Sequence, residues 1–396
     1  MPEPASRRTL QPINRFNEIE NLGHYEIIKK IGQGTFGVVQ KAKHVKTGKV
    51  VALKQLINNL AKEGFPITAI REITILKKLL HPNVLLLVGM IHEETRTSNP
   101  KDVITQRGVF YMVSPYMKAD LVGLLGNPAT SMDVASIKCI MIQLLEGINY
   151  IHQMHFLHRD IKAANILLDP HGVLKIADFG LARVYHGKAP RKGHGPGGGL
   201  RNYTGLVVTR WYRPPELLLG ERKYTTAVDM WGVGCVFAEL FVKKPILVGS
   251  SDSNQAQIIF GLVGPPNKAN WPDATLLPNK QDLNIGLTCT RTLEAKFTPL
   301  MGEAGTDLLS HLLTLDPKAR YNALDTLDHP YFKSEPLAYT PGELPIFEEC
   351  HEIDKERFKR ARSEPPGTPQ KFKKADIVPK PRRNGREGFS RSAMNY

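Results

Sequence analysis

The stretch "HFLHRDIKAANILLDPHGVLKIADFG", from His155 to Gly180, decides the fold of this chain. It places acidic, amide and basic side chains between apolar runs. A charged group is costly to bury unless it is paired or binds an ion. The stretch therefore indicates either a structural polar network or a reaction site.

The segments around this stretch predict two lobes. Just before it, apolar residues in "SIKCIMIQLLEGINYIHQMHF" (136–156) recur at steps of three and one, which is typical of an amphipathic helix. The first hundred residues are instead rich in strand-like segments. We therefore expect an α+β fold, with a small β-rich lobe followed by a larger helical lobe. The stretch "MVSPYMKADL" (112–121) is the candidate hinge between them.

Composition and charge limit the class of protein. The chain has 396 residues, 41% of them apolar, and a net charge of +15. Thirteen Lys or Arg and four Asp or Glu follow position 354, so +9 of this charge lies in the last 42 residues. That tail is poor in large apolar residues, which predicts disorder. Its basic run at 380–383 indicates nuclear import, a docking site for acidic partners, or only solubility.

Cysteine usage and apolar runs indicate the compartment. Four cysteines lie far apart with no CxxC pair, which predicts a reduced intracellular protein. The apolar run at 84–91 is much shorter than the roughly 18 to 20 residues of a membrane helix, so no membrane association is expected.

The glycine-rich segment "IGQGTFGVV" (31–39) is a candidate phosphate-binding loop. The pattern alone is weak, because dinucleotide-binding folds share it. Here a Val-rich hairpin follows instead of a helix, and its last strand places Ala52 and Lys54 on one face. A glycine flap above an ammonium group suits a bound phosphate. Downstream, Glu72 lies on a predicted helix, where it is either solvated or paired with Lys54.

An ordered set of motifs resembles that of the protein kinases. The set comprises Gly32, Gly34 and Gly37, then Lys54, Glu72, "HRDIKAAN" (158–165), "DFG" (178–180) and "PPE" (214–216). The resemblance implies transfer of a phosphoryl group from ATP with Mg²⁺. Asp160 would be the base, Lys162 would steady the phosphoryl group, and Asn165 and Asp178 would bind the metal. Lys162, two residues after Asp160, is typical of serine/threonine kinases.

Within the kinases, residues 25–332 resemble the cyclin-dependent family, with an N-lobe at 25–113, a hinge at 114–118 and a C-lobe at 119–332. Residues 1–24 would be an extension and 333–396 a basic, disordered tail. The segment "PITAIRE" (Pro66 to Glu72) is similar to the family's cyclin-binding helix. The longer "PITAIREITILKKLLHPNV" and "HEETRTSNPKDVITQRGVFYMV" resemble the transcription-elongation branch, the P-TEFb kinase and the fungal Bur-type kinases. Within that branch, "FYMVSPYMKADLVGLL" and "WYRPPE" are more similar to the fungal Bur type. That branch implies a nuclear protein acting on the heptad-repeat tail of RNA polymerase II.

The same resemblance implies the remaining site residues. The nucleotide would contact the residues Ile31, Gly32, Gln33, Gly34, Thr35, Phe36, Gly37, Val38, Val39, Ala52, Lys54, Glu72, Tyr116, Met117 and Leu167. An upstream kinase would phosphorylate Thr204, and the phosphate would be bound by Arg71, Arg159 and Arg183. Val207, Val208 and Arg213 would form a pocket for a proline after the target Ser or Thr, and Thr209 would bridge Asp160 and Lys162.

Two other classes of function stay open on the sequence. A pseudokinase scaffold would keep the fold and recruit partners through its basic tail, but Lys54, Asp160, Asn165 and Asp178 are all present. A nucleic-acid-binding protein would carry a basic stripe with aromatic residues on a folded surface. Here the excess charge lies mainly in the tail, so no direct sequence-specific nucleic-acid binding is expected. Six glycines and two prolines in 186–202 predict a mobile activation loop.

Overall fold

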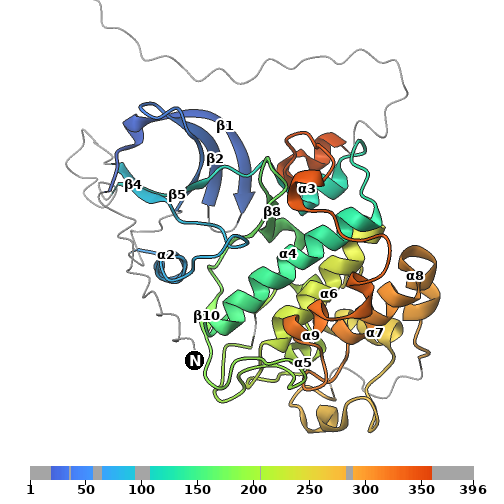
Figure 1. Ribbon diagram of the computed structural model, residues 1–396. Helices are drawn as coiled ribbons and strands as arrows, with labels where there is room; N and C mark the ends of the chain where they lie inside the picture. Colours follow the sequence, from blue (N-terminus) through green and yellow to red (C-terminus); the bar gives the residue numbers. More distant parts are fainter. Residues whose placement is uncertain are drawn as a thin grey trace, which may run out of the picture.

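The chain folds into two lobes, as predicted, with a β-sheet lobe above a helical lobe (Figure 1). The structure is a computed structural model and describes residues 19–34, 37–56, 65–93, 108–205, 207–281 and 289–358. The N-lobe sheet is antiparallel with strand order β1-β2-β3-β5-β4. Its strands are β1 (Tyr25–Gly34), β2 (Gly37–His44), β3 (Val50–Gln55), β4 (Gly89–Glu93) and β5 (Val109–Pro115).

Strand register fixes the positions of the predicted nucleotide residues. Val39 of β2 is paired with Lys54 of β3, and Ala52 of β3 is paired with Ser114 of β5. The strand β5 continues to Pro115, so the connection between the lobes is shorter than the predicted hinge at 114–118. Helix α2 (Ile67–Leu76) lies below the sheet and buries Glu72 (Figure 1).

The C-lobe is built around helix α4. Its helices are α3 (Leu121–Gly126), α4 (Val134–Gln153), α5 (Pro215–Leu218), α6 (Ala227–Val242), α7 (Asp252–Val263), α8 (Leu293–Leu312) and α9 (Ala323–Leu327). Short strands carry the catalytic segment: β6 (Ala119–Asp120), β7 (Phe156–Leu157), β8 (Ile166–Leu168), β9 (Leu174–Ile176) and β10 (Arg183–Val184). By length and composition α4 is apolar enough to cross a membrane, but 72% of its apolar window is buried inside the fold, which is typical of a core helix.

Short 3-10 helices complete the described part of the chain. They are η1 (Leu22–His24), η3 (Ala163–Asn165), η4 (Arg210–Tyr212), η5 (Pro272–Leu276), η6 (Pro330–Phe332), η7 (Pro341–Glu343) and η8 (Glu352–Asp354). Of these, η3 lies shortly after Asp160 and η4 lies in the segment after Thr209, so both belong to the surroundings of the site.

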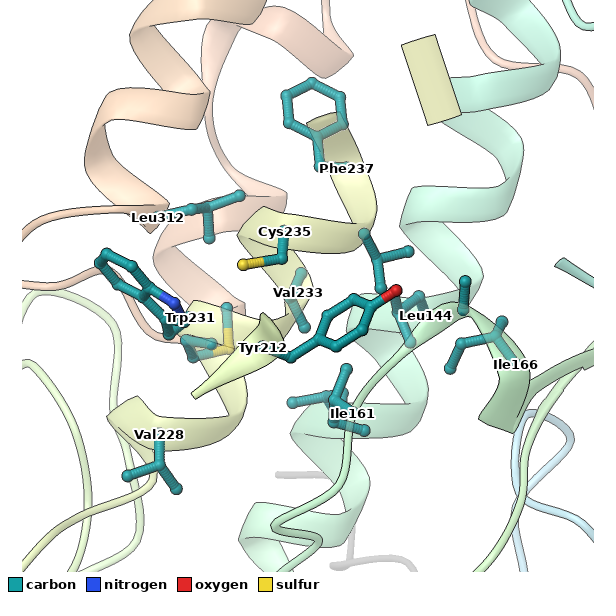
Figure 2. Close-up of a cluster of buried hydrophobic side chains, with 14 of the residues drawn as sticks. Leu144, Ile161, Ile166, Tyr212, Val228, Trp231, Val233, Cys235, Phe237 and Leu312 are labelled. Atoms are coloured by element: carbon teal, nitrogen blue, oxygen red, sulfur yellow. The ribbon is translucent and has the colours of Figure 1, made fainter. Parts of the chain in front are cut away.

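The C-lobe core holds the catalytic segment in place. Figure 2 shows Ile161 and Ile166 of that segment packed with Leu144 of α4 and the side chains of α6. Gly232 of α6 makes close approach possible, because a Cβ there would lie 2.9 Å from the Ile161 carbonyl oxygen. Each fully buried aliphatic side chain stabilises the fold by about 1.5–3 kcal/mol. The loop that carries Asp160 therefore rests on a rigid, apolar base.

Residues 333–358, which we name the C-terminal strap, return to the hinge. Cys350 N donates to the Lys118 carbonyl (3.2 Å), and Asp120 N donates to the Cys350 carbonyl (3.3 Å). Glu349 forms ion pairs with Lys29 (2.8 Å) and Lys41 (2.7 Å) of the N-lobe. Predicted disorder is therefore wrong for 333–358, and the rest of the predicted tail lies outside the described residues. Backbone hydrogen bonds and ion pairs hold the strap in place. Amino-acid composition gives no information on such contacts, which is why the prediction of disorder was wrong here.

The glycine-rich part of the activation loop is also ordered. Asn322 Nδ2 donates to the carbonyls of Arg191 and Gly195 (2.9 Å each), and Gly193 N donates to Asp325 Oδ1 (2.6 Å). Gly193 and Gly195 both have positive φ, which only glycine adopts readily. These glycines therefore allow the backbone to follow a defined path beside α9. The prediction that they make residues 186–202 mobile is not supported.

Candidate active site

The predicted catalytic residues form one hydrogen-bonded cluster. Lys162 Nζ donates to Asp160 Oδ2 (2.7 Å), and Asn165 Nδ2 donates to the same oxygen (3.0 Å). Thr209 Oγ1 donates to Asp160 Oδ1 (2.8 Å) and accepts from Lys162 Nζ (3.2 Å). The structure therefore brings together four residues that are up to 49 positions apart in sequence.

The cluster keeps Asp160 ionised. Burial alone would raise the pKa of this carboxyl group, but the charge and hydrogen bond of Lys162 and the hydrogen bond of Thr209 lower it below its ordinary value. An ionised carboxylate accepts a proton, so Asp160 is suited to receive one from a hydroxyl group placed against it.

A residue that the sequence analysis missed, Asp229 of α6, holds the backbone before Asp160. Its carboxylate accepts from His158 N (2.9 Å) and Arg159 N (2.7 Å), and it contacts His152 Nε2 at 2.9 Å. Arg159 has a left-handed backbone, with φ of 66°. Such a conformation costs about 1–3 kcal/mol, and these hydrogen bonds offset it. The available signal was a charged side chain within the apolar helix "AVDMWGVGCVFAELFV".

The predicted pair of Lys54 and Glu72 is formed. Lys54 Nζ lies 2.9 Å from both carboxylate oxygens of Glu72 and 3.3 Å from Asp178 Oδ1. Burial disfavours the charge of Lys54, but the two carboxylates together raise the pKa of its ammonium group. Burial raises the pKa of Glu72, and the charge of Lys54 opposes this. The ammonium group is thus fixed between α2 and the "DFG" segment.

Several predicted nucleotide residues lie on the N-lobe strands and on the connection that follows β5. Ile31, Ala52 and Met117 are buried, with exposed fractions of 7%, 7% and 4%. Gly37 has positive φ, and a Cβ there would lie 1.7 Å from the Gln55 carbonyl oxygen, so only glycine fits. Tyr116 and Leu167 are half-buried. Thr35 and Phe36 lie outside the described residues.

Two oxygen ligands suit a hard cation. Ala177 N donates to the Asn165 carbonyl (2.9 Å), which places Asn165 beside Asp178 on the neighbouring segment. Asn165 uses its Nδ2 for the Asp160 carboxylate and carbonyl, which leaves its Oδ1 as an acceptor. An amide oxygen and a carboxylate are the ligands that Mg²⁺ prefers. This donor set therefore fits a magnesium ion.

Three arginines converge near Thr204. Burial first, then the charges of Arg183 and Arg159, lower the pKa of Arg71, so the three guanidinium groups repel one another. Tyr224 links this cluster to Thr204, because Arg159 Nη1 contacts the Tyr224 hydroxyl (2.8 Å) and that hydroxyl donates to the Thr204 carbonyl (2.9 Å). Beside the arginines lies a cavity of about 450 Å³, also lined by the basic side chains of Lys78, His186 and Arg201. A phosphate would neutralise such a cluster.

The predicted proline pocket has a strained backbone. Val208 has φ of 68°, which a β-branched residue seldom adopts. Arg213 donates to the carbonyls of Val207 through Nε and of Val208 through Nη2, each at 3.1 Å. The Val208 carbonyl is therefore occupied by Arg213.

The "PPE" motif contributes a buried ion pair that the sequence analysis did not predict. Glu216 is 1% exposed and accepts from Arg320 Nη1 (2.8 Å) and Nη2 (3.0 Å). Arg320 also donates to the carbonyls of Thr314, Ala227 and Leu315, so all five of its N–H groups are used. This pair fixes the end of the activation segment to the C-lobe.

Comparisons with known proteins agree with this geometry. The family model described as "Protein kinase domain" matches residues 25–332. The serine/threonine-protein kinase Bur1 of Debaryomyces hansenii is 70% identical over 89% of this chain and 58% of its own length. The Bur1 kinase of Candida albicans is 65% identical over 87% of this chain and 46% of its own length, and that of Saccharomyces cerevisiae is 49% identical over 85% and 51%. The chain thus spans about half the length of the curated relatives it matches.

A solved structure is similar over the whole kinase fold. A chain from the crystal structure of the yeast RNA Pol II CTD kinase CTDK-1 complex matches with a TM-score of 0.68 and 35% identity, covering 86% of this chain and 99% of that chain. The family match, the identities and the shared fold agree with one another. The chain belongs to the protein kinase family, among the serine/threonine kinases that include the fungal Bur1 kinases.

Proposed function

We propose that this chain is a proline-directed serine/threonine protein kinase that uses ATP and Mg²⁺, is activated by a cyclin, and acts in the nucleus on Ser-Pro and Thr-Pro sites. Its substrates would include the C-terminal repeat domain of RNA polymerase II. The observation that carries the proposal is the Asp160 carboxylate held by Lys162, Asn165 and Thr209. The complete cluster favours catalysis over a pseudokinase scaffold.

In the proposed reaction, the substrate hydroxyl oxygen attacks the γ-phosphorus of ATP. A new O–P bond forms, the bond to the β-phosphate oxygen breaks, and ADP leaves with that electron pair. Asp160 takes the hydroxyl proton, and Lys162, 2.7 Å away, neutralises charge on the phosphoryl group. Lys54 positions the phosphates of ATP. Bound Mg²⁺ would neutralise phosphate charge at Asn165 and Asp178.

The substrate preference gives the first test. When the residue after the target Ser is changed from Pro to Ala, we expect kcat/KM to fall at least about tenfold. An alanine N–H entering this pocket finds the Val208 carbonyl already bound to Arg213, whereas proline has no N–H to satisfy. The measurement is peptide phosphorylation with a matched Ser-Pro and Ser-Ala pair. Equal rates on both peptides would remove proline direction from the proposal.

Activation by a partner gives the second test. We expect the isolated chain to be about 5- to 150-fold less active than its complex with a cyclin, the range of typical coupling between two sites. Helix α2 begins after Pro66 without a side-chain cap, and it exposes Ile67 (72%) and Ile70 (49%). A partner that covers these side chains would favour the state in which Glu72 pairs with Lys54.

Matched variants separate this effect from general damage. Ile67→Glu should abolish activation by the cyclin, whereas Leu276→Glu, at a 78% exposed position in the C-lobe, should not. Thr204→Ala should lower the activity of the complex by removing the phosphate that bridges Arg71, Arg159 and Arg183. A lone, unphosphorylated chain as active as the complex would contradict the switch and leave the catalytic assignment standing.

A further inference from the structure

A carboxylate outside the catalytic cluster faces the proline pocket. Asp252 lies in the first turn of α7, and its oxygens accept from Arg213 Nη1 at 3.0 Å and 3.1 Å. It also accepts from Arg210 Nε at 2.9 Å. The N-terminal end of a helix favours negative charge, and Ser251 caps it by accepting from Asn254 N. Asp252 is therefore a fixed anion placed against two arginines.

Arg213 is held on two sides. One side of its guanidinium group donates to the carbonyls of Val207 and Val208, and the other donates to Asp252. The Arg213 side chain is only 12% exposed, so water reaches it poorly. Among the described contacts of this guanidinium group, Asp252 is the carboxylate that neutralises it.

We infer that Asp252 is a positioning residue for substrate selection: by fixing Arg213, it keeps the Val208 carbonyl turned away from the residue that follows the target Ser or Thr. This inference rests on the proposed proline-directed activity. The left-handed backbone of Val208 is strained and persists because Arg213 holds its carbonyl. Without Asp252, Arg213 turns towards solvent, Val208 relaxes, and its carbonyl accepts the N–H of a residue other than proline.

The test measures the ratio of kcat/KM for a Ser-Pro peptide to that for the matched Ser-Ala peptide, using the full chain with its cyclin. In Asp252→Ala and Asp252→Asn we expect this ratio to fall at least about fivefold, because an unsatisfied N–H no longer penalises the alanine peptide. Asp252→Glu keeps the carboxylate and should retain an intermediate ratio. Because both rates come from one preparation, the fraction of folded enzyme cancels.

Asp273→Ala is the matched control, since it removes an exposed carboxylate paired with Lys318 at 2.6 Å elsewhere in the C-lobe. It should leave the ratio unchanged. If the Asp252 variants keep the wild-type ratio, or lose both rates equally, the inference is overturned and Asp252 has only a structural role. If the wild-type enzyme itself shows no preference for proline, the proposed proline direction fails instead.

Discussion

Replacing Asp160 by asparagine is expected to lower turnover by about 10²- to 10⁴-fold, the contribution of a positioned general base. Asparagine keeps the shape of the side chain but does not accept the hydroxyl proton. The amide oxygen can still accept from Lys162, and the amide nitrogen can donate to Thr209 Oγ1, so the fold of the loop should survive. The measurement is single-turnover phosphorylation of a Ser-Pro peptide by the cyclin complex.

Nucleotide binding separates the role of Asp160 from that of Asp178. In Asp160→Asn the affinity for ATP with Mg²⁺ should remain close to wild type, because Asp160 is not among the residues predicted to bind the nucleotide or the metal. In Asp178→Asn the magnesium-dependent part of that affinity should fall, because a charged oxygen ligand is lost. Titration with and without Mg²⁺ measures both. Full activity in either variant would contradict the assignment of these two aspartates.

Glu216→Gln is expected to lower the free energy of unfolding of the C-lobe by about 3–5 kcal/mol, the usual cost of breaking a buried ion pair. The pair with Arg320 is almost fully buried, with exposed fractions of 1% and 0%. Glutamine would turn an N–H group towards the N–H groups of Arg320 and leave its charge without a counterion. Urea unfolding followed by tryptophan fluorescence measures the change.

An exposed ion pair is the appropriate comparison for that variant. Asp273→Asn removes the pair with Lys318, whose side chains are 52% and 75% exposed, and should change the free energy of unfolding by at most about 1 kcal/mol. If Glu216→Gln were as mild as Asp273→Asn, the Glu216–Arg320 pair would not anchor the activation segment.

The catalytic cluster could be predicted because the sequence matches the ordered motif set of the protein kinases. The needs of phosphoryl transfer, a base, a cation and hard oxygen ligands, then explain the residue types found between Asp160 and Asn165. The N-lobe hairpin could also be predicted, because the two-residue period of a strand places Ala52 and Lys54 on one face. The hairpin prediction used information contained within a few neighbouring residues, whereas Thr209, 49 positions from Asp160, was predicted from the family resemblance alone.

Long-range partners could not be predicted in the same way. Asp229 lies 70 positions from Arg159, and Arg320 lies 104 positions from Glu216, so no spacing rule connects them. A charged residue in an apolar segment signals a buried partner without naming it. Only the packing of α6 against the catalytic segment, with Gly232 at the contact, identifies which groups meet.

The prediction of disorder for residues 333–396 was wrong in part because amino-acid composition was taken over two different segments together. The predicted tail combined the strap, which is described up to position 358, with the more basic residues that follow it. The strap exposes Ile346 almost completely (98%), so apolar burial does not hold every part of it. It is held by paired backbone at Cys350 and by Glu349, whose pKa falls to about 2 because the hydrogen bonds of Lys29 and Lys41 outweigh its burial.

The strap gives the two lobes a second connection beside the hinge. Cys350 exchanges backbone hydrogen bonds with Lys118 and Asp120 in one isolated bridge, and the neighbouring Glu349 forms ion pairs with Lys29 and Lys41 of the N-lobe. Two adjacent residues of the strap therefore contact opposite lobes, which adds noncovalent contacts to the single covalent connection at the hinge. Relative displacement of the lobes therefore has to break these ion pairs or the backbone hydrogen bonds of Cys350. The strap thus favours the relative position of the lobes described here, with Lys54 in the N-lobe and Asp160 in the C-lobe.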